Sequence, residues 1–323
     1  MNMENPVQPQ ENNNNNNQQR FDNPFNLDPE NEDICIERKL ERDMFCPLMA
    51  VSTTFGEQND YYSMRAAKPL KESFFHVIQS FIFPNLTLFQ FSAILCYINL
   101  LMFIIVLCFG IDKTNSDIFL QVRLSIIDAI GSFYPLKIKK NILNYYRLFT
   151  FHFLHFNFAH ICLNIFSLIT YCSFFELLVK KYLFIILFFL SGILSSIASI
   201  AFFEKNERFV GMNGDLSGIF GAFMMFFVMN WEEGLIIFGP TGRFLVAYLV
   251  ALYIFLSFVY FQIMAIGNIS VELISLPFGA LLFAVLVKPI KVKRWKTYMR
   301  IAAGAILFVS ITMALISFYL RDN

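Results

Sequence analysis

One polar run in this chain has the composition of an acyl-transfer site. Residues 211–222 lie beside apolar stretches and contain a serine, Ser217, which is followed by Gly218. A serine at the start of a buried helix, close to backbone amide donors, is the arrangement that an acyl-transfer nucleophile needs. Its hydroxyl attacks efficiently only when a neighbouring base takes up its proton. The run therefore raises the question of which residues supply that base.

Three of the four histidines of the chain, His152, His155 and His160, lie in a second polar group, which precedes the serine. His160 and Asn164 are four residues apart, so they share one face of a helix. His155 lies at the start of the same apolar stretch. The chain has four histidines and the last of them is His160, so none follows Ser217. An imidazole base for this serine must therefore come from residues that precede it in the chain.

An ion pathway or a metal site is an alternative interpretation of these histidines, because intramembrane histidines often mark ion paths. His152, His155 and His160 are separated by three and five residues, which does not place all three on one helical face. No acidic cluster accompanies them. Buried histidines that are hydrogen-bonded for structural reasons account for His152 and His155. We therefore expect no metal and no cofactor.

The elements that must position these groups are expected to be membrane-spanning helices. Of the 323 residues, 57% are hydrophobic and 15% are charged, whereas about a quarter are charged in ordinary soluble domains. About 20 apolar residues are needed to cross the hydrocarbon of a bilayer. The candidate spans are residues 88–110, 153–175, 182–203, 216–231, 244–266, 271–287 and 301–320. The sequence predicts an all-α polytopic membrane protein with the lipid bilayer as a partner.

Two of these regions depart from a simple bundle of spans. The candidate span 216–231 is short, so we expect it to begin below the membrane surface in a cavity lined by protein. The connection 111–148 is long and mixes apolar with charged residues. We predict that it is an interfacial loop with short amphipathic helices.

The N-terminal region differs in composition from the rest. Residues 1–75 begin with an Asn/Gln run and hold thirteen Asp/Glu against seven Lys/Arg, which predicts a disordered acidic tail. Residues 76–323 would then form the membrane domain. The basic connection 288–300 is expected in the cytosol, which places the tail there too. The net charge of +1 predicts no nucleic-acid partner.

The second polar group resembles the rhomboid family of intramembrane serine proteases. The family pattern of His, four residues, His, three residues and Asn is met by His155, His160 and Asn164. The resemblance covers about residues 146–284 and implies a rhomboid-like six-helix bundle.

Further positions agree with this resemblance. Tyr146-Arg147 is similar to an aromatic-Arg pair in the family's first loop, and Glu176 also matches a family position. The span 301–320 adds one C-terminal transmembrane helix, an arrangement similar to that of eukaryotic rhomboids of the secretory pathway. The resemblance therefore implies a location in the secretory pathway.

The resemblance also implies roles for individual residues. Ser217-Gly218 matches the end of the family's Gly-x-Ser-Gly motif, so Ser217 takes the place of the nucleophile. His160 and Asn164, with His155 nearby, take the places that stabilise the oxyanion. The family's base is a histidine on the sixth span, in the pattern Ala-His-Leu-Gly-Gly, three residues and Gly. Residues 276–280 overlay its first five positions and put Pro277 at the base position, and a shift by two puts Ser275 there.

Two more departures agree with the loss of the base. Asp215 replaces the glycine two residues before Ser217, and Gly221 stands where some members carry an aromatic residue. We therefore expect a non-catalytic rhomboid-like protein that binds transmembrane clients, through an opening between its second and fifth spans. An active serine endopeptidase remains an alternative, with His160 as an unconventional base. Glu272, near the start of the sixth span, is a further conceivable proton acceptor.

Overall fold

The computed structural model describes residues 89–112, 118–202, 208–231, 247, 250–257, 259 and 269–320. The predicted tail, residues 1–75, and most of the predicted fifth span lie outside the described residues.

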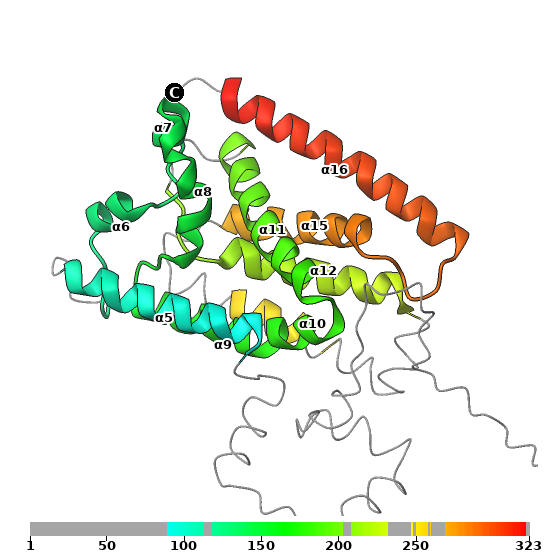
Figure 1. Cartoon of the computed structure of the whole chain (residues 1–323), viewed down its shortest axis with the longest axis horizontal. Helices are drawn as coiled ribbons and strands as arrows, with labels where there is room; N and C mark the ends of the chain where they lie inside the picture. Colours follow the sequence, from blue (N-terminus) through cyan, green and yellow to red (C-terminus); the bar gives the residue numbers. More distant parts are fainter. Residues whose placement is uncertain are drawn as a thin grey trace, which may run out of the picture.

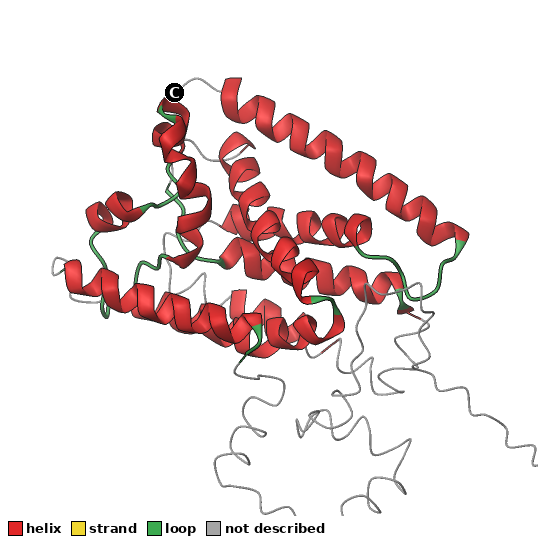
Figure 2. Cartoon of the chain, viewed as in Figure 1, coloured by secondary structure: helices red, strands yellow, loops and turns green. Residues whose placement is uncertain are grey.

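The described chain is a bundle of apolar helices (Figures 1 and 2). Within the described residues, four helical segments are long and apolar enough to cross a membrane, namely Phe91–Phe109, Phe158–Leu178, Lys181–Ala201 and Arg294–Leu320. They correspond to α5 (Phe91–Phe109), to α9 (Phe158–Ser167) with the wider turn η3 (Leu168–Cys172) and α10 (Ser173–Leu178), to α11 (Lys181–Phe202) and to α16 (Arg294–Leu320). Two shorter apolar helices are α12 (Asn213–Met229) and α15 (Ile269–Leu286). The prediction of an all-α polytopic membrane protein is confirmed.

The helices differ in how much of their surface faces the outside of the bundle. The most apolar part of α11 is 72% buried, whereas that of α16 is 22% buried. Most side chains of α12 are buried, on every side of the helix. A helix that is apolar all round belongs in the interior, so α12 is the central helix and α16 lies at the periphery, against α11 and α15 (Figure 1).

The contact between α12 and α15 is made by glycines. A Cβ at Gly279 would lie 1.8 Å from the carbonyl oxygen of Gly218, and a Cβ at Gly221 would lie 2.0 Å from the carbonyl oxygen of Leu276. Small residues let two helix backbones approach in this way. The close approach fixes the rotation of α15 relative to α12, and with it the α15 side chains that face the site.

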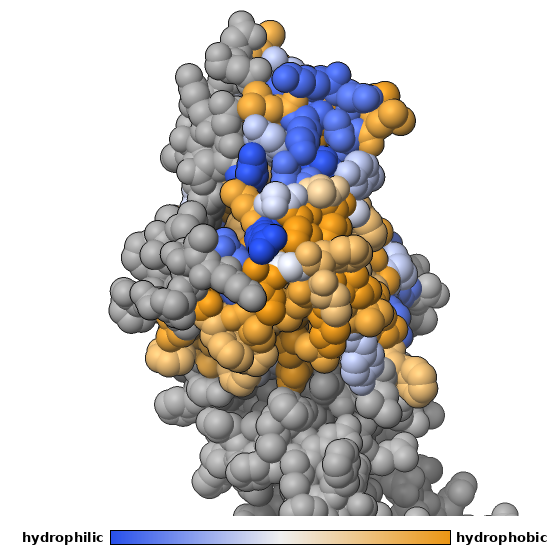
Figure 3. Space-filling view, turned by 90° about the vertical axis from the view of Figure 1, so that its left-hand side faces the viewer, coloured by the Kyte–Doolittle hydropathy of each residue, from blue (hydrophilic) through white to orange (hydrophobic). Residues whose placement is uncertain are grey.

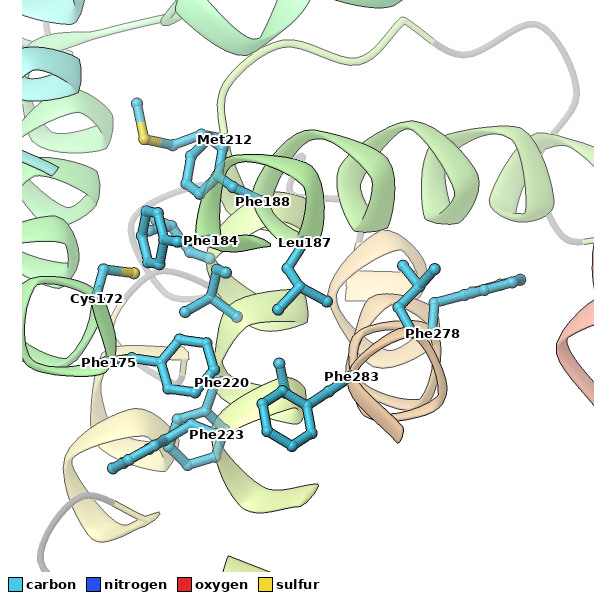
Figure 4. Close-up of a cluster of buried hydrophobic side chains, with 14 of the residues drawn as sticks. Cys172, Phe175, Phe184, Leu187, Phe188, Met212, Phe220, Phe223, Phe278 and Phe283 are labelled. Carbon is cyan, nitrogen blue, oxygen red and sulfur yellow. The ribbon is translucent and has the colours of Figure 1, made fainter. Parts of the chain in front are cut away.

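Phenylalanines fill the space around these two helices. Figure 4 shows Phe175 from α10, Phe184 and Phe188 from α11, Phe223 from α12 and Phe283 from α15 gathered in one apolar cluster. Most of the ring pairs among them meet edge to face or tilted, for example Phe175 with Phe223 at 5.6 Å between centroids. Such geometry is favourable for aromatic pairs, so this cluster holds α10 and α11 against the α12–α15 pair.

The connection between the first two long helices contains short helices, as predicted. These are α6 (Leu124–Ile130), α7 (Pro135–Lys140), η1 (Ile142–Tyr146), α8 (Arg147–Thr150) and η2 (Phe151–Phe153). An isolated antiparallel bridge joins Phe133 to Phe209, close to the start of α12. On the face shown in Figure 3, hydrophobic side chains cover the middle and hydrophilic ones gather above them.

A buried arginine fixes this connection. Arg147, 4% exposed, donates from Nη1 to the carbonyl oxygens of Asp128 and Ser132. Asp128 accepts from Lys137 Nζ at 2.7 Å. Partial burial alone would raise the pKa of Asp128, but the hydrogen bonds from Lys137 and Ser132 and the nearby positive charges lower it overall. Tyr146-Arg147, which resembles the family's pair, thus belongs to the framework of the connection.

The start of α5 is anchored by Glu176 of α10. Its carboxylate accepts from the backbone N–H of Phe91 at 2.6 Å and from the N–H and hydroxyl of Ser92 at 2.8 and 2.7 Å. A carboxylate is favourable at a helix N-terminus, because the first N–H groups there have no partner within the helix.

We expect Glu176→Ala to lower the free energy of unfolding by about 3 kcal/mol, since hydrogen bonds to charged groups contribute about 1.5–3 kcal/mol each. Ser92→Ala removes only the hydroxyl and is expected to cost about 1 kcal/mol. Thermal unfolding of both variants in detergent measures the difference. Equal losses would contradict the anchoring role of Glu176.

Candidate functional site

The site is built where the chain enters α12. Gly211 has a φ of 93° and its N–H donates to the carbonyl oxygen of Phe151. A Cβ at this glycine would lie 2.5 Å from Nε2 of His160. Both the positive φ and the close approach require glycine here. This turn places Asn213, the first residue of α12, directly beside the imidazole of His160.

Three side chains from three helices meet at this point. His160 Nε2 of α9 lies 3.1 Å from Oδ1 of Asn213, and Nδ2 of Asn213 donates to Oε1 of Glu272 of α15, also at 3.1 Å. All three side chains are buried or largely buried: that of His160 is 0% exposed and that of Glu272 is 7% exposed. The amide of Asn213 thus bridges an imidazole and a carboxyl.

The start of α9 holds its histidine in place. Asn157 caps the helix by accepting from the N–H of His160 at 2.8 Å. One turn further along α9, Nδ2 of Asn164 lies 3.1 Å from Nε2 of His155. The rings of His155 and His160 are 4.8 Å apart between centroids. The structure therefore brings together the three residues that carry the His-x4-His-x3-Asn resemblance.

Ser217 lies one turn into α12, beyond Asn213. Its Oγ accepts from the hydroxyl of Tyr253 at 2.9 Å, and the described residues give it no hydrogen bond to an imidazole. It does line a small cavity of about 30 Å³, together with Asn164 and Glu272. Ser217 thus faces the same cavity as Asn164, and it is Asn213 that contacts His160.

The rotation of α15 brings Glu272, and not Pro277, to the site. Pro277 lies on the exposed face of α15. Ser275 is buried and its hydroxyl donates to the carbonyl oxygen of Gly214. Pro277 and Ser275 were the two residues considered for the base position, and neither faces Ser217 as a base would. The contact between Gly279 and Gly218 sets the rotation of α15 so that Glu272 is turned toward α12.

Both family patterns can also be overlaid earlier in the chain, on residues that these contacts bring together. Gly-x-Ser-Gly overlays residues 211–214 with both glycines kept, and Asn213 then stands in place of the serine. The sixth-span pattern overlays residues 271–275 with its last glycine at Gly279, and Glu272 then stands in place of the histidine. The first glycine of Gly-x-Ser-Gly, kept at Gly211, and the last glycine of the sixth-span pattern, kept at Gly279, were the signals that could have shown this.

The carboxylate of Asp215 has a partner of its own. Its Oδ2 lies 2.7 Å from Nδ1 of His152, and both side chains are almost fully buried. Nε2 of His152 lies 3.1 Å from the carbonyl oxygen of Leu148. Asp215 reaches toward α11, where a Cβ at Gly192 would lie 2.2 Å from its Oδ1. His152 and Asp215 therefore form a separate pair that links η2 to α12.

Metal ligation is the other chemistry that the histidines suggested. Among the described residues, no group of three or more His, Cys, Asp or Glu side chains could hold a metal ion.

Fold and site together define a helical integral membrane protein with a polar site at the buried start of a short central helix. Comparison with protein families finds a match to the rhomboid domain over residues 143–289, which includes α9, α12 and α15. The chain therefore contains a rhomboid domain, which supports membership of the rhomboid family. No curated protein matches it.

Proposed function

We propose that this chain is a non-catalytic rhomboid-like protein, a pseudoprotease, that binds the transmembrane helices of client proteins. The observation that carries the proposal is the contact of Asn213 with His160 and Glu272. The family resemblance implies an attacking serine on the fourth span and a histidine base on the sixth. At the two places that face each other here, the chain has an amide and a carboxyl.

The chemistry of these groups supports the loss of proteolysis. A carboxamide is not a nucleophile, so Asn213 cannot replace a serine. Ser217 accepts its hydrogen bond from Tyr253, whose phenol acts there as a donor and not as a base. A serine without base assistance loses about 10²–10⁴-fold in rate.

One observation favours a second candidate, an active serine endopeptidase. Ser217 and the carboxyl of Glu272 line the same cavity. A water molecule between them would allow proton transfer from the serine to Glu272, a different base from the His160 suggested by the sequence.

Labelling with a fluorophosphonate distinguishes the two candidates. We expect no labelling of the full-length protein in membranes and no cleavage of a model single-span substrate, for the unmodified chain and for Ser217→Ala alike. Labelling that disappears in Ser217→Ala, together with cleavage that disappears in the same variant, would establish the endopeptidase instead.

Client binding is supported by the position of the cavity. It lies between α9, which contributes Leu163 and Asn164, and the helical residues 250–257, which contribute Tyr253 and Ser257. This interval, between the predicted second and fifth spans, supports the proposal that a client helix enters there. We place the protein in the secretory pathway with its N-terminus in the cytosol, since the basic connection 288–300 favours that orientation.

The binding function is tested by photocrosslinking. A photoreactive side chain in place of Leu163 is expected to capture single-span proteins in native membranes, and one in place of Phe308, which is exposed on α16, is expected to capture far fewer. Capture of lipid alone from position 163 would contradict the proposal.

A further inference from the structure

Glu272 is isolated from other charges along the chain. Between Arg243 and Lys288 it is the only charged residue, in a stretch that contains the predicted fifth and sixth spans. Its side chain is 7% exposed. A charged group inside a membrane protein is costly unless it is paired or serves a binding function. The fold keeps this one at the edge of the cavity.

Glu272 also differs in its partners from three other described acidic side chains, Asp128, Glu176 and Asp215. Asp128 pairs with Lys137, and Asp215 pairs with His152. Glu176 accepts three hydrogen bonds at the start of α5. Glu272 accepts from the neutral groups Asn213 and Ser257, and no ion pair joins it to a basic side chain among the described residues.

The cavity beside Glu272 has room for a small polar group. Its volume of about 30 Å³ suits one or two groups of the size of a water molecule. The polar side chains that line it are amides, hydroxyls and this one carboxyl, namely Asn164, Ser167, Tyr171, Asn213, Ser217, Tyr253, Ser257 and Glu272. These groups offer one ionisable carboxyl and several oxygen acceptors to whatever enters.

We propose that Glu272 recognises client helices that carry a lysine within the membrane, and that the lysine ammonium enters this cavity. The proposal rests on the function proposed above. An ammonium group is compact and donates three hydrogen bonds, whereas a guanidinium group is a wide plane with five donors. The size of the cavity therefore favours lysine over arginine. The ion pair would stabilise a client residue that is itself costly in lipid.

The position of the site within the bundle sets where the client lysine must lie. Asn213 and Glu272 are near the starts of α12 and α15, close to the connection that contains the short helices α6, α7 and α8. The opposite end of the bundle is marked by Asn230, which accepts from the N–H of Ile290. The lysine is therefore expected in the third of the client helix that is nearest to the connection.

The test uses the full-length chain in membranes, with the photoreactive side chain in place of Leu163. It is combined with single-span reporter helices that are identical except for one residue at that depth, which is lysine, arginine or leucine. We expect the lysine reporter to be captured at least tenfold more than the leucine reporter, and more than the arginine reporter. Glu272→Gln, which keeps the shape of the side chain, is expected to remove the preference. Asp128→Asn makes the same chemical change outside the cavity and is expected to leave it intact.

The outcomes separate this inference from the function on which it rests. Equal capture of all reporters would overturn the lysine preference and leave client binding standing. Capture of none would overturn both. A preference for lysine that persists in Glu272→Gln would assign recognition to another group and overturn the role of Glu272. Glu272→Lys, tested with a reporter that carries glutamate, is expected to restore capture through the reversed pair.

Discussion

Gly279→Ala is expected to separate α12 from α15 and to lower the free energy of unfolding by about 3 kcal/mol or more. The added Cβ would lie 1.8 Å from the carbonyl oxygen of Gly218, a distance that no side-chain rotation can relieve, because the opposing atom is backbone. Overpacking of a filled core costs about 1–3 kcal/mol, and a contact between two backbones is at the upper end of this range.

Gly304→Ala is the matched control for this substitution. Gly304 lies in α16, and a Cβ there would first meet Cγ2 of Val285 at 3.8 Å, which is an ordinary contact. We expect little change from it, or a small gain from the better helix propensity of alanine. Thermal unfolding in detergent compares the two variants. Equal stability of Gly279→Ala and Gly304→Ala would show that α12 and α15 are not held as described.

The spans were predictable because the length of an apolar stretch is a local property of the chain. A helix must bury about 20 apolar residues to cross a bilayer, and the predicted ends of spans such as 88–110 and 182–203 fall within a few residues of α5 and α11. The short fourth span was recognisable for the same reason. Its true start, Asn213, lies three residues before the predicted one, since the polar residues 213–215 are helical.

The sequence alone did not show which of two polar-Gly pairs in α12 contacts His160. Asn213-Gly214 and Ser217-Gly218 are both polar-Gly pairs, and they are four residues apart, so they share one face of α12. A serine match alone favours the second pair. What separates them is the positive φ of Gly211 and the contact of Asn213 with His160, and both arise only when α9 lies beside the turn.

The pairing of Asp215 with His152 also depends on the folded arrangement. The two residues are separated by 63 positions and lie in different elements. From the sequence, each had a separate explanation, as a replaced glycine and as a structural histidine. The expectation that His152 is a buried, hydrogen-bonded residue agrees with its contacts to Asp215 and Leu148.

Restoring the two family residues at the revised positions is expected to create a reactive serine. In the double variant Asn213→Ser with Glu272→His, a hydroxyl and an imidazole would replace side chains that now meet at 3.1 Å. His160 would remain beside the hydroxyl, as an oxyanion-side group. Base assistance contributes about 10²–10⁴-fold, so we expect fluorophosphonate labelling at position 213 at least 100-fold faster than in either single variant.

The single variants and Ser217→Ala make the result specific. Asn213→Ser alone provides a hydroxyl without an imidazole on α15, and Glu272→His alone provides a base without a hydroxyl at position 213. Adding Ser217→Ala to the double variant is expected to leave the labelling unchanged, because Ser217 is one turn further along α12 and is hydrogen-bonded to Tyr253. Labelling that is lost with Ser217, or a double variant that folds and stays unlabelled, would contradict the assignment of Asn213 and Glu272 to the two catalytic places. Labelling as expected would mean that this scaffold still positions a dyad, so that two substitutions convert its polar site into one with a reactive serine.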